Sequence, residues 1–164
     1  SNAGLWGYNI GDTVKFVSKD PYRIIVSGRI KHFISAFGEH VIGEEVEYAL
    51  AKGLAKVPCN IIEFTVAPMI QVAQGLPYHE WLIAFEQVPE NLEQLAKEID
   101  LALQEKNVYY KDLLSGGILQ TLQISVLPKD AFIQYMKAQG KLGGQNKVPR
   151  LSNDRQIAES LLSL

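Results

Sequence analysis

Two long apolar stretches in the middle of the chain restrict its fold more than any other feature. The first is Asn60–Gln71 (NIIEFTVAPMIQ) and the second is His79–Gln87 (HEWLIAFEQ). Both contain many β-branched and aromatic residues, which is typical of strands. Gly75 and Pro77 lie in the connection between them, which is long enough for the chain to turn back. We therefore predict an antiparallel pair of strands.

Apolar residues at helical spacing predict the elements that cover this pair. They recur between Gly43 and Lys56, which predicts a helix over this range. Several glutamates lie in its expected first turn, where carboxylates interact favourably with the helix dipole. Asn91 is a good cap for a helix that ends near Lys106, and its apolar residues form one stripe. Further helices are expected over 108–114, 130–139 and 153–164, and a further strand over 118–127.

The N-terminal part of the chain is expected to form a β-hairpin. Thr13–Ser18 alternates apolar and polar residues, Asp20-Pro21 marks a turn, and Arg23–Ser27 suits a partner strand. A short strand over 33–36 and a turn over 37–39 follow. The pattern predicts an α+β domain with a mainly antiparallel sheet covered by helices, preceded by this hairpin. The expected divisions are 1–3 (the remnant of an expression tag), 4–28 (hairpin and lead-in) and 29–164 (main domain).

Charge and cysteine content argue against several function classes. Sixteen basic and eighteen acidic residues give a net charge of −2, so no surface for nucleic acid or for an anionic membrane is expected. No apolar run approaches the roughly 20 residues that span a bilayer. The single Cys59 fits a reducing compartment, and we expect a cytoplasmic protein. His32, His40 and His79 have no metal-site spacing, so we expect no structural metal.

Two stretches in the first forty residues have a composition that core packing does not explain. Tyr8–Asp12 (YNIGD) is compatible with an ordinary turn, or with an aspartate that accepts both hydroxyl protons of a ribose. Ser27–Glu39 (SGRIKHFISAFGE) is compatible with an edge strand between two tight turns. Alternatively, it contains a hinge at Arg29–Lys31 and a loop at Gly38 whose backbone approaches a ligand.

A third such stretch is the glycine-rich segment Gly140–Arg150 (GKLGGQNKVPR). Leu142 and Val148 are its only apolar anchors, so ordering it without a ligand is entropically unfavourable. It lacks the spacing of a phosphate-binding P-loop. Two interpretations stay open: a flexible connector, and a mobile loop that delivers one lysine to a phosphate.

In this order the three stretches resemble the C-terminal signature of the adenylate-forming superfamily, which includes acyl-CoA synthetases, peptide-synthetase adenylation domains and luciferases. YNIGD is similar to its Y-R-T-G-D element, and Gly28–Lys31 is similar to its G-R-x-[DK] hinge. The register then holds from Gly38 to Glu47 against G-E-N-I-x-x-x-E-I-E. Lys147–Arg150 resembles the final G-K-x-x-R element.

Within that superfamily the chain is most similar to bacterial members of the auxin-responsive acyl acid amido synthetase family. The similarity rests on GLWxYNIGDTVKF, PYRIxVSGRxKHFIxAFGE, HEWLI and GKLGGQxKVPRLSNxR. It implies that the chain is the small C-terminal lid domain of a larger ligase. In such enzymes a carboxylate attacks the α-phosphate of ATP, pyrophosphate leaves, and an amino acid accepts the acyl group. The lid rotates about its hinge between the two half-reactions.

The resemblance also implies roles for individual residues. Tyr8, Asp12 and Arg29 would bind ATP, with the Asp12 carboxylate on the ribose hydroxyls. Lys31 would lie at the hinge. Lys147 would be catalytic, because a flexible point charge can neutralise the charge that develops on the carboxylate and α-phosphate oxygens.

The chain departs from the family pattern in two places. Asn9-Ile10 replaces an arginine and a threonine, so their ligand contacts are not transferred to this chain. Gln145-Asn146 occupies the place of the glycine before the catalytic lysine, which makes Lys141 a rival because it does follow a glycine. We prefer Lys147, since only this lysine has the paired Arg150.

Other features of the sequence bear on the reaction. His79-Glu80-Trp81 would either face the acceptor amine or begin a strand with one buried tryptophan. The sequence lacks the acyl pocket and the Ser/Thr-Gly-rich phosphate loop that the family carries on a large N-terminal domain. We therefore expect the fragment to be inactive alone and to work with that missing domain. The expected ligands are ATP with Mg²⁺, a carboxylic acid and an amino acid. Alternatives are the lid of a coenzyme A thioester ligase and a non-catalytic binding module.

Overall fold

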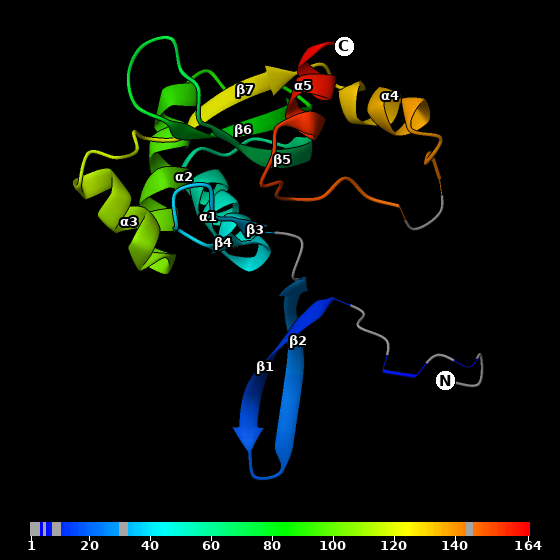
Figure 1. Ribbon diagram of the computed structural model, residues 1–164. Helices are drawn as coiled ribbons and strands as arrows, with labels where there is room; N and C mark the ends of the chain where they lie inside the picture. Colours follow the sequence, from blue (N-terminus) through cyan, green and yellow to red (C-terminus); the bar gives the residue numbers. More distant parts are fainter. Residues whose placement is uncertain (1–3, 5, 8–10, 30–32, 144–145) are drawn as a thin grey trace.

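The domain is built on a three-stranded sheet. A computed structural model describes residues 4, 6–7, 11–29, 33–143 and 146–164 (Figure 1). Strand β5 (Ile61–Met69) pairs antiparallel with β6 (Tyr78–Phe85), with Val66 opposite Trp81. Strand β7 (Gln123–Leu127) runs parallel to β6 on its other edge. The predicted antiparallel pair is confirmed, and β6 lies in the middle, where every residue except Tyr78 is buried.

Helices cover both faces of the sheet because successive residues of a strand point to opposite sides. Trp81 and Ile83 pack in one core cluster, whereas Leu82 and Ala84 pack in the other. The first face is covered by α1 (Gly43–Lys56), α2 (Leu92–Lys106) and α3 (Val108–Ser115), and the second by α4 (Ala131–Ala138) and α5 (Gln156–Leu162) (Figure 1). The predicted α+β class, with helices over a mainly antiparallel sheet, is confirmed. Among the described residues, no helix has the length and apolar character needed to cross a membrane.

Gly53 allows α1 and α2 to pack closely. A Cβ atom on Gly53 would lie 2.5 Å from Cγ1 of Ile99 and 3.3 Å from Cδ1 of Leu95. Both neighbours are fully buried in the first core cluster. A glycine in a helix is intrinsically unfavourable by about 1 kcal/mol relative to alanine, so this one is present because of the contact.

We expect Gly53→Ala to destabilise the domain despite its better helix propensity. Overpacking a core costs about 1–3 kcal/mol, which exceeds the propensity gain. The measurement is the free energy of unfolding in urea. The matched control is Gly43→Ala in the same helix, where an added Cβ meets no atom within 4 Å and stability should be unchanged or higher. Equal stabilisation by both substitutions would contradict this account of the contact.

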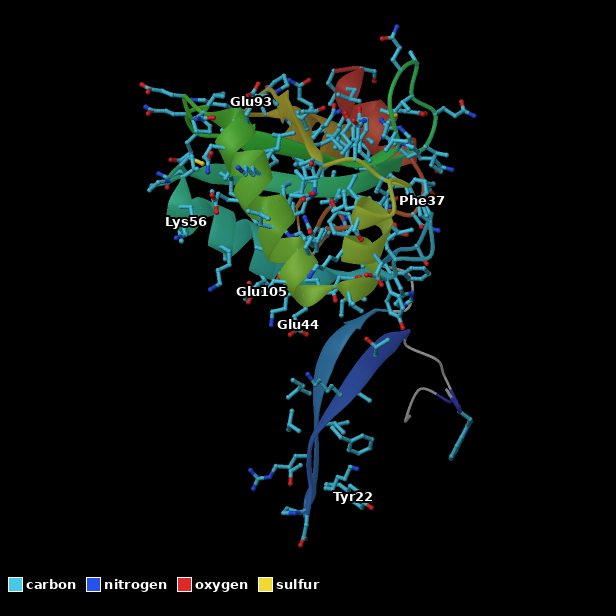
Figure 2. All side chains as sticks on the ribbon, turned by 90° about the vertical axis from the view of Figure 1, so that its left-hand side faces the viewer. Tyr22, Phe37, Glu44, Lys56, Glu93 and Glu105 are labelled. Carbon is cyan, nitrogen blue, oxygen red and sulfur yellow. The ribbon has the colours of Figure 1, made fainter. Side chains whose placement is uncertain are left out.

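The predicted N-terminal hairpin consists of β1 (Asp12–Lys19) and β2 (Tyr22–Arg29), which pair antiparallel. It projects from the helix-covered sheet, and Figure 2 shows Tyr22 near its far end. Several of its apolar side chains are more than half exposed: Val14, Phe16, Val17, Tyr22, Ile24 and Val26. A two-stranded ribbon of this kind is at best marginally stable in water without a partner.

A small sheet differs from the prediction near residue 40. Strand β3 (Phe33–Ile34) is shorter than the expected 33–36, and it pairs with β4 (Val41–Ile42), which was not predicted. Each strand has only two residues, so neither shows a measurable alternation. The pairing depends on the turn between them rather than on local propensity.

Two predicted boundaries were wrong. The strand expected over 118–127 begins only at Gln123, because the preceding residues turn back and the Gln120 amide donates to the carbonyl of Pro77. The last helix begins at Gln156 rather than at 153, because the side chain of Asp154 accepts a hydrogen bond from the Gln156 amide and holds the residues before it in a turn.

Candidate functional site

The glycine-rich segment starts where α4 ends. Gly140 has a φ of +64°, and the Lys141 amide donates to the carbonyl of Met136 at 2.9 Å. This arrangement terminates a helix in a common way, with a glycine in the left-handed region. Leu142, one of the two expected apolar anchors, is 54% exposed and contributes little to holding the segment.

The other end of the segment is attached to strand β5. The Val66 amide donates to the carbonyl of Arg150 at 2.9 Å, and the Ser152 amide donates to the carbonyl of Val66 at 3.0 Å. Leu151 therefore forms a parallel bridge with Val66 and is buried. Val148 is buried in the second core cluster. The segment is thus firmly anchored after Lys147, which composition alone had not indicated.

Arg150 lies against the edge of the sheet within a group of acidic and aromatic side chains. Its guanidinium forms an ion pair with Glu63, and its Nε lies 3.5 Å from Oε1 of Glu47 in α1. Its Nη1 donates to the carbonyl of Phe64 at 3.2 Å, and its Cζ lies 4.6 Å from the centre of the Phe64 ring. The guanidinium of Arg150 is therefore paired with carboxylates of this domain.

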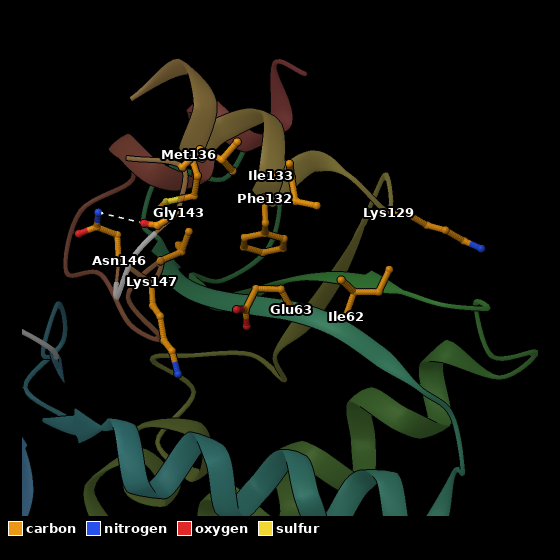
Figure 3. Close-up of a pocket in the computed structure, with 11 residues that line it drawn as sticks. Ile62, Glu63, Lys129, Phe132, Ile133, Met136, Gly143, Asn146 and Lys147 are labelled. Atoms are coloured by element: carbon orange, nitrogen blue, oxygen red, sulfur yellow. Dashed lines mark hydrogen bonds between the residues drawn. The ribbon is translucent and has the colours of Figure 1, made fainter. Parts of the chain in front are cut away.

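Lys147 precedes the attached segment 148–151 in the sequence. It lines a groove of about 230 Å³ between α4 and β5. Its side chain is exposed, and Figure 3 shows it extending away from α4. Among the described residues, none forms an ion pair with its ammonium group. Lys129 and Glu63 also line the groove, whereas Lys141 does not. The rest of the lining is mainly apolar: Ile62, Phe132, Ile133, Met136, Leu142 and Val148.

The Gly38 turn is fixed from inside the protein. Gly38 has a φ of +92°, and its α-carbon faces open space, so a ligand could approach its backbone. The next residue, Glu39, is fully buried, and its Oε1 lies 2.9 Å from Nε2 of the equally buried His79. Its Oε2 accepts a hydrogen bond from the Phe37 amide at 2.8 Å. The side chain of Glu39 thus holds the turn that exposes Gly38.

Burial raises the pKa of the Glu39 carboxyl, but other interactions outweigh this effect. Hydrogen bonds from His79 and from backbone amides, together with electrostatic attraction to the His79 ring, hold its pKa below the usual value. Tyr110, whose ring centre lies 5.0 Å from that of His79, donates from its hydroxyl to Asp100 at 2.6 Å. Burial and the neighbouring Asp100 carboxylate raise the pKa of Tyr110 well above its ordinary value.

The pKa of Glu39 predicts how the stability of the domain depends on pH. Because the folded-state pKa is below the unfolded one, ionised Glu39 stabilises the fold above about pH 4.5, and this contribution is lost as the pH falls through the folded pKa. We expect Glu39→Gln to cost about 1–3 kcal/mol at pH 7, and the difference from wild type should shrink towards pH 3. Urea unfolding across this range measures it. The control is exposed Glu44→Gln, and a difference that grows on acidification would refute the assignment.

The stretch His79-Glu80-Trp81 belongs to the interior. His79 and Trp81 are fully buried and Glu80 is 4% exposed, with its carboxylate paired with Arg155 at 2.6 Å. The interpretation as the start of a strand with a buried tryptophan is confirmed. Cys59 is half-buried beside the first core cluster.

The structure places only part of the expected nucleotide site. Asp12 and Arg29 are opposite each other at the open end of the β1–β2 hairpin. Tyr8 and the hinge residue Lys31 lie outside the described residues. The functions expected for these four residues stay predictions.

Sequence reasoning missed Glu63 and Glu39. An acidic residue between Ile62 and Phe64 in an otherwise apolar strand was the available signal for Glu63. Glu39 was included in the Gly38 stretch, but nothing local indicated that its partner would be His79, forty positions further along the chain.

Comparison with known proteins agrees with this fold. The sequence model described as "GH3 family C-terminal domain" matches residues 44–156, well over half of the chain. The chain therefore belongs to the GH3 family and carries its C-terminal domain. No curated protein sequence gives a significant match.

Two solved structures share the fold at low sequence identity. One is described as "GH3.15 acyl acid amido synthetase", with a TM-score of 0.74 and 17% identity over 98% of this chain. The other is described as "AtGH3.15 acyl acid amido synthetase in complex with 2,4-DB", with a TM-score of 0.71, 17% identity and the same coverage of this chain. This chain spans only 31% and 30% of their respective lengths.

Proposed function

We propose that the protein containing this chain is an ATP-dependent acyl acid amido synthetase, and that the chain is its C-terminal lid. The family match and the names of the two similar structures support the enzyme class. The observation that carries the proposal is Lys147: an exposed lysine without an ion-pair partner among the described residues, directly before a segment anchored on the sheet. Such a lysine can enter the active site of a neighbouring domain while its backbone stays on the lid.

In the proposed reaction a carboxylate oxygen of the acyl acid attacks the α-phosphorus of ATP, and the bond to pyrophosphate breaks. Negative charge concentrates on the oxygens around the phosphorus during this step. The ammonium of Lys147 would stabilise that charge without transferring a proton. The amine of an amino acid then attacks the acyl carbon, AMP leaves, and an amide forms. The related structure in complex with 2,4-DB suggests an acidic small molecule as acyl donor.

Mg²⁺ is expected to accompany ATP, but we assign no residue of this chain to it. The described residues include no group of three or more His, Cys, Asp or Glu side chains placed to hold a metal ion. Asp12 and Arg29 are the proposed contacts to the nucleotide, since their backbones pair with each other at one end of the hairpin. A cytoplasmic location is likewise a proposal, based on the lone cysteine.

The test is carboxylate-dependent exchange of pyrophosphate into ATP by the full-length protein, with a panel of carboxylic acids. We expect Lys147→Ala to lower the exchange rate by about 10²–10³-fold, the usual loss when one charge-stabilising group is removed. Lys141→Ala is the matched control and should stay near wild type. Exchange that survives in Lys147→Ala but not in Lys141→Ala would move the role to Lys141.

Product analysis with an amino acid and with coenzyme A completes this experiment. An amide product supports the proposal, whereas a coenzyme A thioester as the only product would contradict it. The 164-residue chain alone should form neither product, because the acyl pocket is expected on the missing domain.

The exposed apolar hairpin supports a larger partner region in the same protein. Val14 pairs with Val26 and Phe16 with Ile24, so these four side chains form one apolar face that is 51–67% exposed. A face of this kind is normally covered in the native assembly. We propose that the rest of the protein covers it.

Limited trypsin digestion tests this coverage. Lys15 and Lys19 in β1, both exposed, should be cleaved readily in the isolated chain and at least about tenfold more slowly in the full-length protein, because cleavage requires an accessible backbone. Exposed Lys137 in α4 provides an internal reference site. Equal cleavage of β1 in both proteins would show that the hairpin is not covered.

A further inference from the structure

Glu63 is an acidic residue in a strand that otherwise contributes to the core. Its side chain is 25% exposed, between Ile62 and the buried Phe64. The pairing of β5 with β6 shifts register between Ile61 and Glu63, and such irregularities change the direction in which a side chain points. A partly desolvated carboxylate here is favourable only if a cation pairs with it. That cation is Arg150.

The Arg150 side chain is held on a rigid platform. Phe64, beneath the guanidinium, is 3% exposed and stacks on Trp81 with ring centres 5.7 Å apart and an angle of 7° between the planes. Glu63 approaches the guanidinium from β5 and Glu47 from α1. Glu63 is the better placed of the two carboxylates, because the Glu47 contact is 3.5 Å long and its side chain is 62% exposed.

The contacts of Arg150 restrict the position of the Lys147 backbone. Its Cα is three residues from that of Arg150, so the two are within about 11 Å of each other along even a fully extended chain. Between them, Val148 is buried and the Pro149 carbonyl accepts from the Thr65 hydroxyl at 2.7 Å. On the other side of Lys147, the contacts of the Asn146 side chain with described residues are long, at 3.5 Å to the carbonyls of Lys141 and Gly143. The position of Lys147 is therefore set from the Arg150 side.

We propose that Glu63 is a positioning residue for Lys147, which it acts on through Arg150. Glu63 and Lys147 line the same groove from two different segments (Figure 3). Backbone hydrogen bonds to Val66 attach the segment that follows Lys147. By pairing with Arg150, Glu63 selects one orientation of this attached segment and neutralises the neighbouring cation. Of the two cations Arg150 and Lys147, only Lys147 then remains available to interact with a developing negative charge. The catalytic consequence rests on the proposed function, whereas the positional consequence does not.

A spin label tests the positional part directly, in the full-length protein with Cys59 and any other cysteines replaced by serine. A nitroxide on Lys147→Cys should become more mobile, with a narrower EPR line, when Glu63→Gln is added. A nitroxide on Lys141→Cys should not change. Glu47→Gln is the matched control substitution and should leave the label at position 147 as it is. An unchanged line at position 147, or equal narrowing at both positions, would refute positioning by Glu63.

Kinetics test the catalytic part in the unlabelled protein. Glu63→Gln should lower kcat for pyrophosphate exchange by about 10–100-fold with little change in the KM for ATP, because a displacement of about 1 Å can cost 10²-fold. Aminolysis of a supplied acyl-adenylate should be nearly unchanged, and a general loss of structure would slow both reactions. Charge exchange, with Glu63→Arg and Arg150→Glu combined, should recover part of the loss.

The outcomes separate the two proposals. If wild type exchanges pyrophosphate and Glu63→Gln does so equally well, the role of Glu63 is wrong and the amido synthetase proposal stands. If the wild-type protein neither exchanges pyrophosphate with any acid in the panel nor aminolyses a supplied acyl-adenylate, the proposed function fails. The EPR comparison then still decides whether Glu63 positions Lys147.

Discussion

The central strand β6 is the constraint on which the rest of the domain depends. It is hydrogen-bonded along both edges and covered on both faces, so an ionised side chain on it is favourable only with a partner inside the protein. Two adjacent residues, His79 and Glu80, point to opposite faces. His79 pairs with Glu39 at the Gly38 turn, and Glu80 accepts hydrogen bonds from Arg155 at 2.6 Å and from Ser125 at 2.5 Å. One strand thereby contacts segments that precede it and segments that follow it in the sequence.

The Gly38 turn and the segment that contains Lys147 consequently belong to one rigid unit. The Gly38 turn and the segment after Lys147 are connected directly, because the Ser35 amide donates to the side chain of Asn153 at 2.9 Å. Helix α1, which follows the turn, also contributes Glu47 to the contacts of Arg150. In the proposed enzyme, a lid rotation would move both segments together as parts of a single body. No internal rearrangement would be needed to withdraw one and present the other.

Local sequence signals predicted the regular elements well and the long-range contacts poorly. The helix expected over 43–56 has those bounds, and the Asn91 side chain caps α2 by accepting from the Gln94 amide, because spacing and capping act within a few residues. The motif resemblance identified Lys147 and Arg150 as candidates. It could not reveal that Arg150 pairs with Glu63, 87 positions earlier, or that Leu151 adds to the edge of β5. Those contacts exist only once the sheet has formed.

The energetics of the Arg150 contacts favour a geometric role over a stabilising one. Both partners of its pair with Glu63 keep some exposure, 32% and 25%, and pairs of this kind contribute about 0–1 kcal/mol. The attachment of the segment comes instead from backbone hydrogen bonds to Val66 and from the burial of Val148 and Leu151. A weak ion pair added to a strong attachment changes stability little, but it selects one orientation. That is what a lysine needs if it must reach a reacting phosphate on another domain.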